Sequence, residues 1–112
     1  MAERTAVYAE DCVRFCKMVP LDAVTRPIVV QLVRSSTSIG ANYHEANNAE
    51  SRNDFKHKIC ICRKESKETM YWFRIMGVAV PSIKERADIL LLEADELNRI
   101  FNQIVNTLKS RE

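Results

Sequence analysis

Apolar residues recur along this chain in alternating steps of four and three, the spacing that keeps a stripe of side chains on one side of an α-helix. The pattern is longest in two segments of the second half. The first stripe is Phe55, Ile59, Cys62, Ser66, Thr69, Phe73 and Met76. The second is Ile83, Ala87, Leu90, Ala94, Leu97, Phe101, Ile104 and Leu108. Each segment is predicted to be a long helix with one buried face.

The same spacing predicts two further helices in the first half. Residues 4–19 carry Tyr8, Cys12, Phe15 and Val19, and residues 27–47 carry Val29, Leu32, Ser36, Ile39, Tyr43 and Ala46. Small residues fill the centre of the segment 27–47, where Gly40 costs about 1 kcal/mol relative to alanine. Such residues indicate a close backbone approach to a neighbouring helix.

Candidate helix starts divide the chain into four segments. They are Thr25 with Pro27 in the first turn, Ser51 with Asp54, and Ser82 with Glu85. The predicted helices are about 4–19, 27–47, 52–79 and 83–109, in one domain covering residues 1–112. Four helices with short connections predict an all-α fold, an antiparallel up-down-up-down left-handed four-helix bundle.

The net charge of +2 conceals a local excess. Residues 51–76 hold seven lysines and arginines against three acids, a net of +4, while the remaining segments are close to neutral. Along this helix a basic stripe runs down one edge of the seam: Arg52, Lys56, Arg63, Lys67 and Arg74. The opposite edge carries Ile61, Trp72 and Ile75, with Glu65 and Glu68 between them.

Each edge has a purely structural interpretation and a functional one. The basic edge is either a solvated face or a surface that binds nucleic-acid phosphate. On the functional interpretation, the edge with Ile61, Trp72 and Ile75 packs against another subunit. Polar residues beside the seams, namely Asn42, Glu45, Glu65 and Glu68, either hydrogen-bond between helices and fix their register or line a ligand pocket.

Catalytic and metal motifs are scarce. A di-metal bundle needs Glu-x-x-His pairs, but His44 precedes Glu45 directly and His57 lacks a glutamate three positions before it. Cys12, Cys16 and Cys62 could meet in the core as zinc ligands, although buried apolar cysteines are commoner. There is no phosphate-binding glycine loop. We therefore expect no enzyme, no metal and no cofactor.

Cysteine usage and hydropathy suggest a location in the cytoplasm. The four cysteines form no CxxC pair, and the first residues lack an apolar signal region. No apolar run approaches the roughly 20 residues that span a bilayer. Reduced thiols in a cytosol and no membrane association are the expectation.

Four segments resemble a known family. Residues 36–45 (Ser-Thr-Ser-Ile-Gly-Ala-Asn-Tyr-His-Glu) resemble the Ser-x-Ser-Ile-x-x-Asn-x-x-Glu signature of the bacterial four-helix-bundle proteins encoded in 23S rRNA intervening sequences. Residues 51–55, 64–73 and 93–97 resemble the patterns of its third and fourth helices. The likeness covers about residues 5 to 109.

The resemblance implies a bundle that assembles as a ring-like homopentamer without established enzymatic activity. The accessory protein of diversity-generating retroelements shares this architecture, and its basic ring engages nucleic acid and a reverse transcriptase. By motif, Asn42, Glu45, Glu68 and Trp72 have structural roles. Our leading hypothesis is a non-enzymatic, oligomeric binding module for RNA or DNA. The alternatives are a structural module with a protein partner, and a bundle with a small-molecule or metal site.

Overall fold

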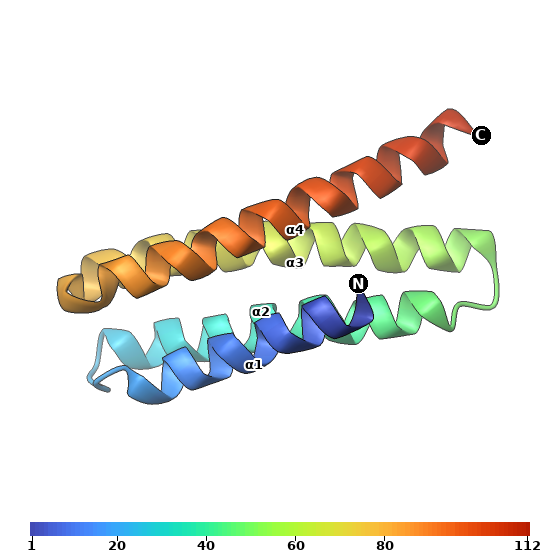
Figure 1. The fold of residues 1–112 in the computed structure, drawn as a ribbon. Helices are drawn as coiled ribbons and strands as arrows, with labels where there is room; N and C mark the ends of the chain where they lie inside the picture. Colours follow the sequence, from blue (N-terminus) through green and yellow to red (C-terminus); the bar gives the residue numbers. More distant parts are fainter.

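The computed structural model describes all residues 1–112 and contains four α-helices arranged up-down-up-down (Figure 1). They are α1 (Ala2–Met18), α2 (Thr25–Asn47), α3 (Arg52–Ala79) and α4 (Lys84–Ser110), with a short 3₁₀ turn, η1 (Pro81–Ile83), before α4. The molecule measures 47 × 22 × 21 Å. The predicted all-α four-helix bundle is confirmed, with every helix within three residues of its expected bounds.

The helix starts follow local chemistry that the sequence only partly predicted. The Ser51 hydroxyl accepts a hydrogen bond from the Asp54 amide at 3.0 Å, so that cap is confirmed. The start of α2 is capped by Asp22, whose carboxylate accepts from the amides of Val24 and Thr25, both at 2.8 Å. The Thr25 hydroxyl instead accepts from the Asp22 amide. Thr25 is the first residue of α2, with Pro27 in the first turn, so the predicted helix start is confirmed.

The predicted cap at Ser82 is wrong. No side chain caps the start of α4, and Ser82 lies inside the 3₁₀ turn η1 with Pro81 at its beginning. The proline fixes the turn geometry one residue earlier than a serine cap requires, and α4 begins at Lys84. The fourth helix still lies where its hydrophobic stripe placed it.

The predicted stripes form the core. Every stripe residue of α1 and all but Phe55 of α3 are buried, whereas Val29, Tyr43, Leu90 and the ends of the α4 stripe are half-buried. The core also contains residues outside the stripes: Thr5, Cys16, Thr25, Ile28, Ser35, Glu65, Asn98 and Val105. Each buried face is therefore wider than a single row of side chains, as expected for helices with neighbours on two sides.

The close approach predicted for α2 is present at Gly40. A β-carbon at this position would lie 3.4 Å from the carbonyl oxygen and from the hydroxyl of Thr5 on α1. The helices pack unevenly around the bundle, because α3 lies along both α2 and α4 whereas α1 packs mainly on α2. The α1–α4 side is joined by the Tyr8 hydroxyl, which donates to the Leu90 carbonyl at 2.7 Å, and by an Arg4–Glu93 pair.

Candidate functional site

The basic stripe occupies the side of α3 that faces α4. The Asn98 amide on α4 donates to the Arg63 carbonyl at 2.8 Å and to the Ser66 hydroxyl at 3.0 Å, which fixes this edge of α3 against α4. An open depression of about 270 Å³ lies between the helices and has no apolar lining residue. Its lining is Arg63, Lys64, Lys67, Asn98 and Asn102.

Most cations of this stripe are free of carboxylate partners. Of the five predicted residues, only Lys56 forms an ion pair, with Glu112. Arg52, Arg63, Lys67 and Arg74 have no carboxylate oxygen within 4.0 Å of their nitrogens. On α4, Asp88 and Asp95 pair with cations of their own helix. The edge therefore presents positive charge that the protein does not neutralise.

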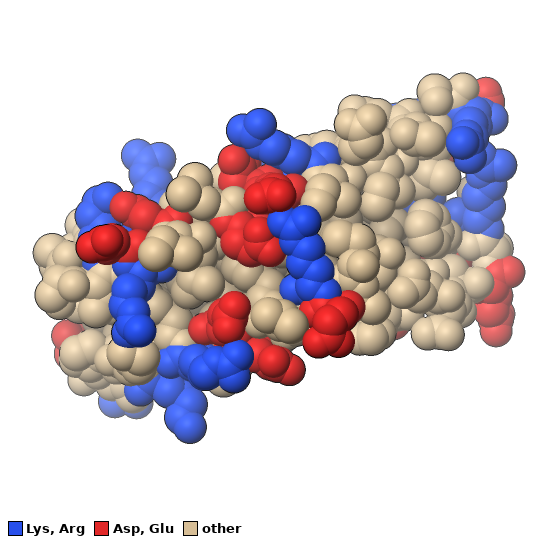
Figure 2. All heavy atoms as spheres, viewed as in Figure 1, with Lys and Arg blue, Asp and Glu red and all other residues tan.

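A second cationic cluster lies where α3 begins and α4 ends. A depression of about 170 Å³ there is lined by Arg52, Asn53, Lys56, Leu108, Arg111 and Glu112. Figure 2 shows lysine and arginine side chains gathered at this end of the molecule, whereas cations and acids are intermixed along the rest of the visible face. Lys56 lowers the pKa of the exposed Glu112 carboxyl. Arg111 was not predicted, because it lies beyond the last hydrophobic stripe.

The predicted subunit-interface residues lie on the opposite edge of α3, and all three are half-buried. Trp72 and Ile75 pack partly on the protein's own core. Tyr71, 55% exposed, meets Trp72 edge to face with ring centroids 5.1 Å apart. Tyr71 is the exposed apolar side chain here, and Glu68 with Arg34 lies beside Trp72, so the role of this edge as an interface stays a prediction.

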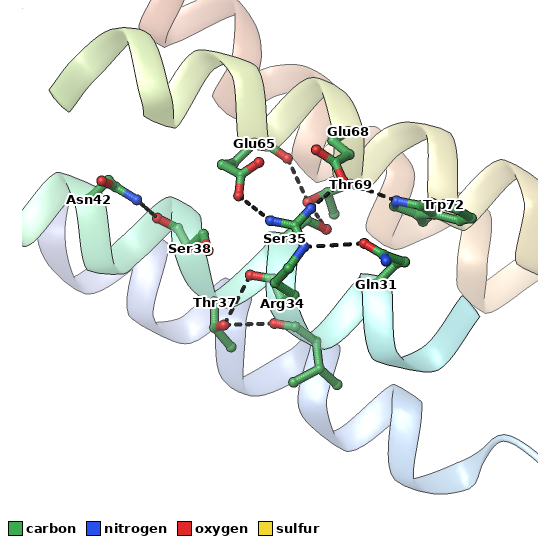
Figure 3. Close-up of polar contacts among 11 residues, drawn as sticks. Gln31, Arg34, Ser35, Thr37, Ser38, Asn42, Glu65, Glu68, Thr69 and Trp72 are labelled. Atoms are coloured by element: carbon green, nitrogen blue, oxygen red, sulfur yellow. Dashed lines mark hydrogen bonds and ion pairs between the residues drawn. The ribbon is translucent and has the colours of Figure 1, made fainter. Parts of the chain in front are cut away.

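Between α2 and α3 the polar residues form one connected cluster around Arg34 (Figure 3). The Arg34 guanidinium donates to Glu65 at 2.7 Å, to Glu68, and to the Gln31 side chain at 3.2 Å. The Trp72 indole donates to Glu68 at 3.4 Å. The Glu65 side chain is 8% exposed and that of Arg34 is 45% exposed. One arginine therefore serves two carboxylates across the helix interface.

Within this cluster Arg34 changes the pKa of Glu68. Burial disfavours ionisation of Glu68, but hydrogen bonds from Arg34 and Trp72 outweigh it and lower the Glu68 pKa. Arg34 was not predicted, because the polar candidates beside the seams were acids and amides only. Its position directly before the small residues that begin at Ser35 was the available signal.

Of the remaining polar candidates, Glu45 connects two helices and Asn42 does not. Glu45 on α2 pairs with Lys58 on α3 at 3.2 Å, an interhelical contact as predicted. The buried Thr69 hydroxyl donates to the Ser35 hydroxyl at 2.9 Å, which adds a contact between α3 and α2 that was not predicted. Asn42 does not connect helices, because its amide donates to the Ser38 carbonyl within α2. The interhelical role proposed for Asn42 is therefore absent.

The buried thiols are protonated side chains of the core. Burial raises the pKa of Cys12 to about 12, of Cys16 to about 11 and of Cys62 to about 12. The Cys62 thiol lies 3.4 Å from the Ile39 carbonyl oxygen, to which it donates. No group of three histidine, cysteine, aspartate or glutamate side chains is arranged to hold a metal ion. No helix is both long enough and apolar enough to cross a membrane.

Comparison with known proteins relates the chain to one family. The family described as 23S rRNA-intervening sequence protein matches residues 1–103. A solved structure of a protein with unknown function, from the S23 ribosomal protein family of Bacteroides thetaiotaomicron VPI-5482, is 30% identical in sequence. It superimposes with a TM-score of 0.80, covering 93% of this chain and 96% of the other. No curated protein matches the chain.

Proposed function

The chain belongs to the family of 23S rRNA-intervening sequence proteins, and within that family we propose that it is a non-enzymatic, oligomeric module that binds nucleic acid. The basic edge of α3 is the binding surface, and its residues are Arg52, Lys56, Arg63, Lys67 and Arg74. The protein acts in the cytoplasm, through assembly and binding rather than chemistry.

The observation that carries this proposal is the uncompensated charge on α3. Arg52, Arg63, Lys67 and Arg74 have no ion pair, although the chain has almost as many acids as bases. Nine ion pairs elsewhere engage six other lysines and arginines. Free cations on one rigid helix favour a polyanionic partner, because each phosphate contact releases condensed counterions.

Assembly into a homo-oligomer is the second part of the proposal. The apolar edge with Ile61, Trp72 and Ile75, extended by the exposed Tyr71, offers an aromatic-rich surface of the kind enriched at interfaces. By the family resemblance we propose a homopentamer. Sedimentation velocity at micromolar concentration tests this: a species several times the 12.9 kDa chain mass is expected, and a monomer would contradict it.

Salt-dependent binding tests the nucleic-acid part. If the four unpaired cations each contact one phosphate, the slope of log affinity against log salt for a duplex is about −3.6. Raising salt from about 0.05 to about 0.2 M should then weaken binding by about 150-fold. The double variant Arg63→Gln, Lys67→Gln should lower the slope by about 1.8.

The matched control removes one lysine and one arginine elsewhere. Lys17 on α1 and Arg26 on α2 are exposed and unpaired, so Lys17→Gln, Arg26→Gln changes the net charge equally and should leave the slope unchanged. Absence of binding near 0.05 M salt refutes the proposal, and so does binding without salt dependence. A protein captured equally well by the Arg63, Lys67 variant would favour the protein-partner alternative.

A further inference from the structure

We propose that the partner of the basic edge is a double helix, held through the phosphates of both its strands. This inference rests on the proposed function and specifies the class of nucleic acid. It follows from the spacing of the cations, from what else lies on their face, and from the width of the α3–α4 surface.

The cations repeat every 11 residues. Arg52, Arg63 and Arg74 are separated by 11 positions, and Lys56 and Lys67 follow the first two by four. Eleven residues make three helical turns and a small remainder, so equivalent side chains return to nearly the same face about 16.5 Å further along the axis. Because α3 is continuous from Arg52 to Ala79, the row is rigid and about 33 Å long.

This repeat matches the backbone of a duplex. One turn of a DNA double helix is about 34–36 Å long. A line along the surface of the duplex crosses each of the two strands once per turn, so crossings occur on average about every 17 Å. The three cationic groups of α3 can therefore contact successive strand crossings, with the long arginine and lysine stems absorbing the unequal groove widths.

The face lacks the series of aromatic side chains that a single strand would use. Sequence-tolerant binding of single strands combines cations with aromatic side chains on which bases stack. The depression beside Arg63 has no apolar or aromatic lining residue. Trp72 donates to Glu68 at the α2 interface, and Tyr71 is the one exposed aromatic side chain of α3, four positions after Lys67 and three before Arg74. A single tyrosine does not form a platform for successive bases, so phosphate contact along the row favours the duplex.

The width of the α3–α4 surface limits its contacts to the sugar–phosphate backbone of the duplex. Packed helices lie about 8–10 Å apart and each is about 10–12 Å wide, so α3 and α4 together present roughly 20 Å. A major groove is about 12 Å wide and admits one helix. The α3–α4 pair therefore lies across grooves, and binding should be independent of base sequence.

The experiment measures fluorescence anisotropy with four probes: duplex RNA and duplex DNA of about 12 base pairs, single-stranded RNA of the same length, and duplex RNA of about 6 base pairs. A duplex of about 12 base pairs spans the whole row, and one of about 6 spans two of its three groups. We expect the longer duplexes to bind at least tenfold more tightly than the single strand. Their salt slope should be about −3.6, against about −2.7 for the short duplex.

The variant Arg74→Gln makes the test specific to the row. It should reduce the salt slope of the long duplex by about 0.9. The slope of the short duplex should not change, because that probe can occupy the Arg52–Lys67 part of α3. The control Arg26→Gln should alter neither slope, and far-ultraviolet circular dichroism should show unchanged helicity for both variants.

The outcomes separate this inference from the proposed function. Salt-dependent binding of the single strand as tightly as the duplex overturns the duplex inference and leaves the proposed function standing. Equal salt slopes for the long and short duplexes also overturn it, because the row is then not engaged over its length. Failure of every probe to bind overturns both. Preference between duplex RNA and duplex DNA identifies which double helix is the partner.

Discussion

Replacing Arg34 with methionine tests the polar cluster between α2 and α3. The substitution keeps an unbranched apolar stem but removes the guanidinium that serves Glu65 and Glu68. Glu65 is then left almost buried without its cation. A hydrogen bond to a charged group contributes about 1.5–3 kcal/mol, and a half-exposed pair such as Arg34–Glu68 adds at most about 1 kcal/mol.

We expect Arg34→Met to lower the free energy of unfolding by about 2–3 kcal/mol. The loss of stability is smaller than for a fully buried ion pair, because the Arg34 side chain is partly exposed. For a domain of this size about 1 kcal/mol corresponds to about 4 °C, so the melting temperature should fall by about 8–12 °C. Urea denaturation followed by circular dichroism measures the free energy, and calorimetry the melting temperature.

Arg14→Met is the matched control. Arg14 pairs with Glu10 and Asp11 on the surface of α1, where all three side chains are well exposed, and its loss should cost less than about 0.5 kcal/mol. On the Arg34→Met background, Glu65→Gln should recover about 1 kcal/mol, because it removes the unpaired buried charge. Equal destabilisation by Arg34→Met and Arg14→Met would refute the reasoning.

Acid titration gives a second readout of the same cluster. Because the folded-state pKa of Glu68 is below its ordinary value of 4.5, ionised Glu68 stabilises the fold above that value, and this stabilisation is lost as pH falls through the folded-state pKa. The wild type should therefore lose more stability than Arg34→Met between pH about 5 and about 3. Identical pH profiles for the two proteins would contradict the assignment.

Three further predictions concern the core. Gly40→Ala should stabilise the protein by up to about 1 kcal/mol in urea denaturation, since a β-carbon fits against Thr5 at contact distance, whereas Gly40→Leu should destabilise it. A loss of stability in the alanine variant would show that the helices cannot accept the β-carbon. Tyr8→Phe should cost about 1 kcal/mol by removing the hydrogen bond to Leu90, measured in the same assay; no change would mean that this bond contributes nothing net. In the folded protein at pH about 8, a thiol reagent should react much more slowly with the buried thiols than with half-buried Cys60; the buried thiols are Cys12, Cys16 and Cys62. After unfolding, the reagent should react with all four thiols. Equal rates in the folded state would refute their burial.

The candidate site could be predicted from sequence only where one helix carries it. The basic stripe lies within α3, so helical periodicity alone placed its five residues on one edge. Arg111 joins the same charged end from another helix, and nothing in the local pattern indicates that α4 ends beside the start of α3. Asn98 was missed for a related reason, since its partners Arg63 and Ser66 lie more than 30 positions away.

The sequence by itself determined the number of helices, their bounds to within a few residues and the family, because periodic apolar positions are local and repeat many times along each helix. Only the tertiary structure decided how polar groups pair. Arg34 serves Glu65 and Glu68, whereas Asn42, inside the recognised motif, bonds within its own helix. Pairing depends on the rotation and register of neighbouring helices, and a shift of one residue turns a side chain through about 100°. The basic edge depends on the local sequence pattern and on tertiary packing. Helical periodicity within α3 places its cations in a row, and the packing of α4 leaves most of them without a carboxylate partner.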